Sequence, residues 1–156
     1  MIRLALGVVA LSLAATAGFA EDMTVATANS LKWGPAPPAL PKGAQLAVLA
    51  GDPGSNGPYV IRTKLPAGYT IAAHNHPTVE NVTVVSGTFN IGMGDKVDKK
   101  HAQVLKAGSF VSMPANMNHY AWATSAVVLQ IHGQGPFAIN YVNPADDPSK
   151  AGSASR

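Results

Sequence analysis

The stretch that decides the fold is GYTIAAHNHPTVE, residues 68–80. His74 and His76 stand two positions apart, and residues at that spacing on an extended strand project from the same face. Pro77 biases His76 away from helical backbone and toward the extended form that a strand-borne ligand needs. The carboxylate of Glu80, on a neighbouring strand, could reach the same space as the two imidazoles. The pattern therefore predicts two imidazoles and a carboxylate that face a common point, as in a metal site.

A third histidine ends the stretch GSFVSMPANMNH, residues 108–119. We expect His119 to complete the shell formed by His74, His76 and Glu80. Three neutral imidazoles and one carboxylate would leave a divalent ion with a charge near +1 and one or two open coordination positions. The chain has no cysteine, so the ligands are nitrogen and oxygen, which suit Fe, Mn, Ni, Cu or Zn. The sequence predicts one divalent metal ion and leaves its identity open.

Short runs rich in β-branched and aromatic residues follow one another at nearly even spacing, separated by Gly, Pro, Asn or Asp. This pattern, without a helical period, predicts an antiparallel all-β sandwich or barrel. The expected strands cover residues 45–49, 59–65, 79–85, 88–93, 103–105, 110–113, 119–123, 127–132 and 137–142.

The spacing of glycines around the histidines is specific. Gly68, His74-x-His76, Glu80 and Gly87 match every fixed position of the first motif of the cupin superfamily, which the chain resembles. Glycine at such strand boundaries makes sharp turns with the least strain. The resemblance implies a cupin jelly-roll β-barrel, also called a double-stranded β-helix, and often a homodimer.

The second cupin motif is only partly kept. Gly108, Pro114 and His119 match it, but Asn116 stands where cupins usually have glycine and Ala123 where they usually have asparagine. Asparagine tolerates positive φ better than other non-glycine residues, so Asn116 can make the same turn. The loss of asparagine at position 123 bears on substrate or fold details more than on metal ligands.

The beginning of the chain is typical of export. A short basic start with Arg3 precedes an apolar run over 4–17. Gly18 and Ala20 then supply the two small residues of a cleavage site. The run is shorter than a membrane-spanning helix needs. We expect a signal peptide over 1–20, cleavage after Ala20, a secreted or periplasmic location and no stable membrane anchor after cleavage.

The rest of the chain divides by composition. A proline-rich lead-in over 21–43 cannot hold a helix and should lie across the surface. The cupin domain is expected over 44–143, and the small polar residues of 144–156 suggest a flexible tail. Basic residues are scattered apart from a cluster near residues 96–100 that also contains aspartates, which favours a solvated hairpin tip and no nucleic-acid partner.

Four other polar residues could bear on a site. His132 could face inward as a proton carrier, although a surface position before a glycine is favoured. His101 is expected in a solvated loop. Arg62 and Lys64 share a strand face, so they could line an opening together, but a solvated edge strand is favoured.

The sequence leaves three functions open. Three imidazoles and one carboxylate also mark dioxygenases of the cupin superfamily, such as quercetinase-like enzymes, so the resemblance favours a metal-dependent oxidoreductase with Glu80 as a base. The alternatives are a non-catalytic periplasmic ligand-binding or metal-sensing cupin, and a metal-dependent isomerase or lyase. In each case the partner is a small molecule.

Overall fold

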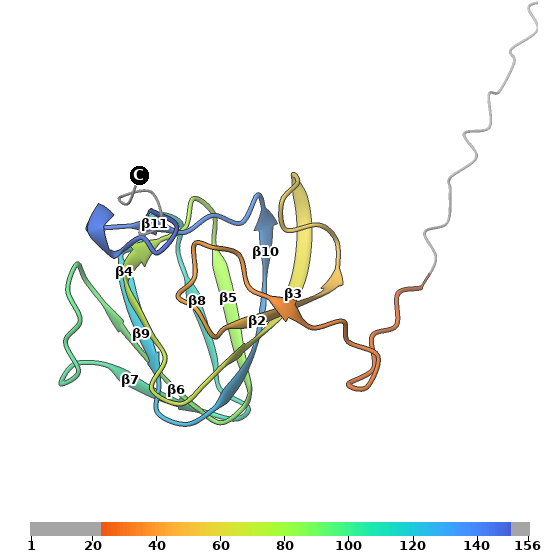
Figure 1. The fold of residues 1–156 in the computed structure, drawn as a ribbon, viewed down its shortest axis with the longest axis horizontal. Helices are drawn as coiled ribbons and strands as arrows, with labels where there is room; N and C mark the ends of the chain where they lie inside the picture. Colours follow the sequence, from red (N-terminus) through yellow and green to blue (C-terminus); the bar gives the residue numbers. More distant parts are fainter. Residues whose placement is uncertain (1–22, 151–156) are drawn as a thin grey trace, which may run out of the picture.

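A computed structural model describes residues 23–150 and shows a sandwich of two antiparallel sheets (Figure 1). The predicted signal peptide over 1–20 lies outside the described residues, as does the end of the predicted tail, 151–156. Within the described part, no helix is long and apolar enough to cross a membrane. Its one helical segment is the 3-10 turn Pro144–Asp146.

The first sheet has six strands in the order β1-β2-β3-β10-β5-β8. Their bounds are Gly34–Pro35, Gln45–Ala50, Gly57–Leu65, Val127–Gly135, Glu80–Ser86 and Phe110–Met113. The second sheet has five strands in the order β11-β4-β9-β6-β7. Their bounds are Asn140–Tyr141, Thr70–Asn75, His119–Ala123, Thr88–Met93 and Gln103–Lys106.

Alternation in the first sheet places its inner face on the core. In β3 the side chains of Ile61, Thr63 and Leu65 are buried, whereas the residues between them are half-buried or exposed. In β10 the same period buries Leu129 and Ile131. Because alternate residues of a strand point to opposite faces, the first sheet covers the core with one face. In the second sheet, β6 and β9 have consecutive buried residues over 89–92 and 119–121, so these strands are buried on both faces there. The all-β antiparallel prediction is confirmed, and the arrangement fits a jelly roll.

The expected strands agree closely with the observed ones. β6, β8 and β9 have the predicted bounds. β10 runs three residues further than expected because its last residues still pair with the start of β3. Glycine at 133 and 135 permits this pairing, since a Cβ would lie 2.7 Å from the Val79 carbonyl oxygen and 2.1 Å from that of Ser55. The last strand is shorter than predicted. β1 was not predicted, and β4 is missing from the expected runs, although His74 was expected on an extended strand.

Two turns behave as the motifs require. Gly87, between β5 and β6, has a φ of +82°, a conformation that L side chains rarely adopt. Asn116 has a φ of +61° and is the non-glycine residue with positive φ in the described chain. Its backbone N–H donates to the carbonyl oxygen of His76 at 2.8 Å. Asparagine therefore makes a turn at the position where the second cupin motif has glycine, as predicted.

The proline-rich lead-in is held against the sheets. The Tyr141 hydroxyl donates to the Ala39 carbonyl at 2.8 Å, and the Tyr69 hydroxyl donates to that of Pro41 at 2.5 Å. Between these two anchors, Leu40 packs against the hydrophobic core. The segment thus forms part of the wall of the sandwich as well as of its surface.

Candidate metal site

The four predicted ligands come from three strands and meet between the two sheets. His74 lies in β4, His76 directly after its end, and Glu80 and His119 begin β5 and β9. His74 and His119 are opposite one another in the pairing of β4 with β9. The end of β4, the short loop to β5 and the pairing of β4 with β9 therefore bring all four side chains to one end of the core.

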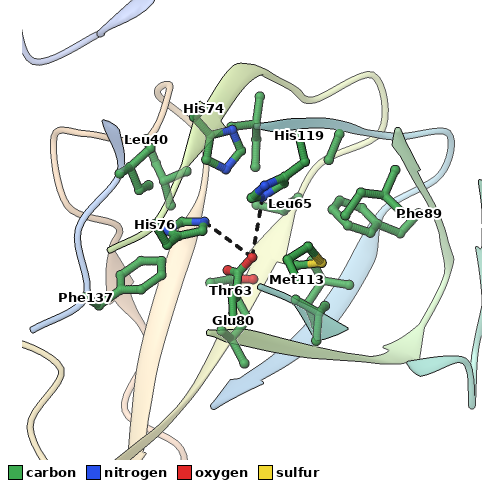
Figure 2. Close-up of a pocket in the computed structure, with 17 residues that line it drawn as sticks. Leu40, Thr63, Leu65, His74, His76, Glu80, Phe89, Met113, His119 and Phe137 are labelled. Atoms are coloured by element: carbon green, nitrogen blue, oxygen red, sulfur yellow. Dashed lines mark ion pairs between the residues drawn. The ribbon is translucent and has the colours of Figure 1, made fainter. Parts of the chain in front are cut away.

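The imidazoles form a compact cluster. One ring nitrogen from each of His74, His76 and His119 lies within 4.8 Å of the other two. Glu80 Oε2 lies 3.3 Å from His76 Nε2 and 3.6 Å from His119 Nε2. Figure 2 marks these two ion pairs with dashed lines. All four residues are buried, with exposed fractions of 6% or less. The structure thus brings together the predicted residues.

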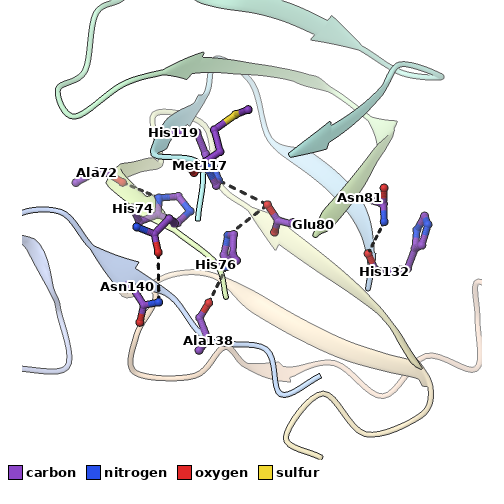
Figure 3. A network of polar contacts seen from close by, with 11 residues as sticks. Ala72, His74, His76, Glu80, Asn81, Met117, His119, His132, Ala138 and Asn140 are labelled. Atoms are coloured by element: carbon purple, nitrogen blue, oxygen red, sulfur yellow. Dashed lines mark hydrogen bonds and ion pairs between the residues drawn. The ribbon is translucent and has the colours of Figure 1, made fainter. Parts of the chain in front are cut away.

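Each imidazole is fixed by a backbone carbonyl on its outer side (Figure 3). His74 Nδ1–H donates to the Ala72 carbonyl at 2.7 Å, and His76 Nδ1–H donates to that of Ala138 at 2.7 Å. His119 Nδ1–H donates to the Met117 carbonyl at 3.0 Å. A carbonyl oxygen can only accept, so the proton of each neutral ring is on Nδ1 and the lone pair is on Nε2. This second contact is the one that orients metal-ligating histidines.

The donor set fits a divalent metal. His76 Nε2 is buried and makes no hydrogen bond among the described residues: with the proton on Nδ1, its lone pair faces the Glu80 carboxylate oxygen at 3.3 Å with no donor between them. Such an atom is costly unless it is satisfied by something beyond the protein. A metal ion would satisfy it together with the lone pairs of His74 and His119, and the carboxylate of Glu80 would offset part of its charge.

The buried charges influence one another. Burial, reinforced by the neighbouring His119 and His76, lowers the pKa of His74 to about 3. Burial opposes ionisation of Glu80, but the adjacent His119 and His76 outweigh it and lower the pKa of the carboxyl group. Burial also opposes protonation of His76, yet Glu80 outweighs it and raises that pKa. Glu80 is therefore ionised, and His74 is neutral, over the ordinary pH range.

A cavity of about 40 Å³ lies against the cluster. This space holds roughly three water molecules, at about 10–15 Å³ each. Apart from the cluster and Thr63, every residue that lines it is apolar, and no Lys or Arg is among them. Leu40 from the lead-in and Phe137 contribute to the wall (Figure 2).

The other candidate residues lie outside this site. His132 is exposed on the outer face of β10, which confirms the favoured surface position over the inward one. His101 is exposed and contacts Asp98 at 2.7 Å, as expected of a loop residue. Arg62 and Lys64 share the outer face of β3 and do not line the cavity. The expectation of an edge strand is also wrong, because β3 lies between β2 and β10.

Thr63 and Leu40 line the cavity, and neither was predicted from the sequence as a site residue. Thr63 is buried beside the apolar residues of β3, and the alternation of that strand could have placed its hydroxyl on the inner face. Leu40 lies in the lead-in, and no sequence signal marks it as a residue of the cavity, since its place depends on distant tyrosines.

Comparison with known proteins gives a family and a fold. A family model described as "Domain of unknown function (DUF4437)" matches residues 16–140. The search of curated proteins found no match.

Several solved structures share the fold. The polyketide cyclase RemF of Streptomyces resistomycificus is 12% identical, with a TM-score of 0.67 over 85% of this chain and 94% of that one. A candidate acetylacetone dioxygenase of Methylibium petroleiphilum PM1 is 17% identical, with a TM-score of 0.65 over 90% and 100%. An RmlC-like cupin of Ralstonia eutropha JMP134 is 19% identical, with a TM-score of 0.56 over 83% and 86%. At these identities the likeness establishes the cupin fold.

Proposed function

Because this chain belongs to the DUF4437 family and has a cupin fold, we propose that it is a metal-dependent oxidoreductase of the dioxygenase type that acts on a small organic substrate. The observation that carries the proposal is the convergence of three Nε2 lone pairs on one point, each fixed by a carbonyl at Nδ1. The fold shared with a candidate acetylacetone dioxygenase supports the reaction class.

His74, His76, His119 and Glu80 would hold one divalent metal. When bound, a redox metal such as iron would supply electron transfer between substrate and dioxygen. Glu80 contacts both His76 and His119, and its lowered pKa keeps it ionised. Glu80 also lines the cavity, so on leaving the metal it would be within reach of a substrate there and would accept a proton as a general base.

The lining of the cavity favours a small substrate of low polarity. Its walls are apolar beyond the cluster and Thr63, and they exclude bulk water from the reacting groups. No cation among the lining residues could clamp a phosphate group or a sugar acid. This lining supports the oxidoreductase over an isomerase or lyase that acts on such substrates.

Metal content tests the site. We expect about one divalent metal per chain in protein purified from its native compartment, and loss of that metal in the His119→Ala variant, because a ligand is removed. His132→Ala is the matched control, since His132 is an exposed histidine. The measurement is elemental analysis of folded protein. Full metal content in His119→Ala would remove His119 from the shell.

Oxygen uptake tests the reaction. With the metal bound, we expect the protein to consume dioxygen with one member of a panel of small diketones, small thiols and flavonoids. Glu80→Gln should reduce the rate by at least about a hundredfold if Glu80 is the base. A metal-loaded protein that binds compounds of the panel and consumes no dioxygen would instead be a non-catalytic ligand-binding protein, as the alternative function requires.

We also propose that the protein acts after export. The support is the sequence of residues 1–20, which has the basic, apolar and small-residue parts of a signal peptide. N-terminal sequencing of the native protein should begin at Glu21. A native protein that begins at Met1 in the cytoplasm would contradict this location.

A further inference from the structure

Thr63 is a buried polar residue that the metal cluster does not use. Its side chain is 3% exposed, and its hydroxyl oxygen has no hydrogen-bond partner among the described residues. The other polar side chains of the cavity all belong to the metal cluster. Figure 2 shows Thr63 among the side chains that point into the cavity. An unpartnered hydroxyl in such a place costs free energy unless a ligand or water satisfies it.

Thr63 lies at a different depth from the metal ligands. Across the first sheet, Tyr59 of β3 faces Gly133 of β10, and Gly133 faces Glu80. Thr63 faces Leu129, four residues further along both strands. At about 3.3 Å per residue, this offset is about 13 Å along the strand direction. The cavity therefore has polar groups at two separated levels, with apolar side chains such as Ile131 and Val82 between them.

We propose that Thr63 is a specificity-determining residue, whose hydroxyl pairs with the far end of the substrate. The ligand class is a slender chain with an oxygen-bearing group at one end for the metal, an apolar middle, and a second hydrogen-bonding oxygen at the other end. Because the cavity measures about 40 Å³, the apolar side chains that line it must move apart to admit such a chain. The inference rests on the proposed function only in that the metal holds the first group. Thr63 contributes to ligand choice and not to metal binding.

The test compares two ligand series on the zinc-loaded protein, in which no oxidation occurs. The probes are short straight-chain carboxylates and the matching ω-hydroxy carboxylates, scanned over chain length by isothermal titration calorimetry. At the best length, wild type should bind the ω-hydroxy compound more tightly than the plain one. In Thr63→Val, the affinity for the ω-hydroxy compound should fall about tenfold, because its hydrogen bond to the Thr63 hydroxyl is lost. The affinity for the plain carboxylate should stay the same or rise.

Two further variants keep the result interpretable. Thr63→Ser retains the hydroxyl and should keep the preference of wild type. Thr83→Val is the matched control, since Thr83 lies on the outer face of the same sheet, and it should change neither series. Thermal unfolding of metal-free Thr63→Val should show a melting temperature equal to or above that of wild type, because an unpartnered hydroxyl is replaced by an isosteric methyl group.

Metal content separates this inference from the proposed function. A wild-type protein that does not bind zinc would overturn the metal site itself. Normal zinc content in every variant, with no ω-hydroxy preference at any chain length or with one that Thr63→Val leaves intact, would overturn the role of Thr63 alone. Failure of loaded wild type to bind either series would overturn the ligand class. A clear loss of stability in Thr63→Val would mark the hydroxyl as structural and would overturn the inference too.

Discussion

At the scale of single residues, the environment of His74 links the site to pH. The unfolded chain takes up a proton on this imidazole near pH 6.5, whereas in the folded protein the pKa is about 3. Between these values the unfolded state binds more protons, so the stability of metal-free protein should fall as the pH drops through this window, by up to ~5 kcal/mol. His76, whose pKa is raised, also contributes to stability, but this contribution is lost as the pH rises above about 6.5. It therefore lies outside the pH window in which His74 titrates.

Urea unfolding of metal-free protein across that window measures the effect. His74→Asn removes the titrating group and should flatten the slope of stability against pH below about 6.5. Glu80, whose pKa is lowered, also stabilises the protein less as the pH falls, so some slope should remain. Parallel curves for wild type and His74→Asn would show that His74 is not the group responsible.

The convergence of the four candidate ligands could be predicted because the spacing within their motifs is local. His74-x-His76 and Glu80 depend on one strand and one loop, and His119 on a recognisable motif. The Nδ1 contacts could not be predicted, because the Ala138 carbonyl reaches His76 from a segment 62 residues away. Thr63 was missed for a similar reason, since whether a buried hydroxyl finds a partner depends on side chains across the sandwich.

At the scale of elements, the turn between β5 and β6 should tolerate little change. A Cβ at Gly87 would lie 2.2 Å from the Ala126 carbonyl oxygen, and the φ is positive. Gly87→Ala should therefore destabilise the fold by about 3 kcal/mol or more. Gly108→Ala is the matched control, because its φ is also positive but nothing lies within 4 Å of the added Cβ, and it should cost about 1–2 kcal/mol.

Chemical denaturation of both glycine variants measures the difference. Equal losses would show that the contact with Ala126 is relieved by a movement of the backbone. The strands around these turns were predictable, since alternation and turn residues act locally. β1 was not, because two residues of a proline-rich segment form a strand only when β2 is there to pair with them.

At the scale of the whole molecule, metal binding and folding should be coupled. The ligands come from both sheets, so an ion that binds only the folded state stabilises the whole sandwich. Free metal at about a hundred times its dissociation constant should add about 2.7 kcal/mol. Thermal unfolding with and without chelator measures this, and in His119→Ala the two melting temperatures should coincide. A wild-type melting temperature that is the same with and without chelator would contradict the coupling.

The anchoring of Leu40 by two tyrosine hydroxyls has an evolutionary consequence. The barrel carries the metal ligands, whereas a segment that precedes the barrel supplies part of the wall that a substrate would touch. Insertions or replacements in that segment leave the histidine cluster untouched, so it can diverge at little risk to the candidate metal site. Relatives with the same histidines but a different segment before the barrel would then accept different molecules, and new substrates could arise by changing an accessory stretch of chain.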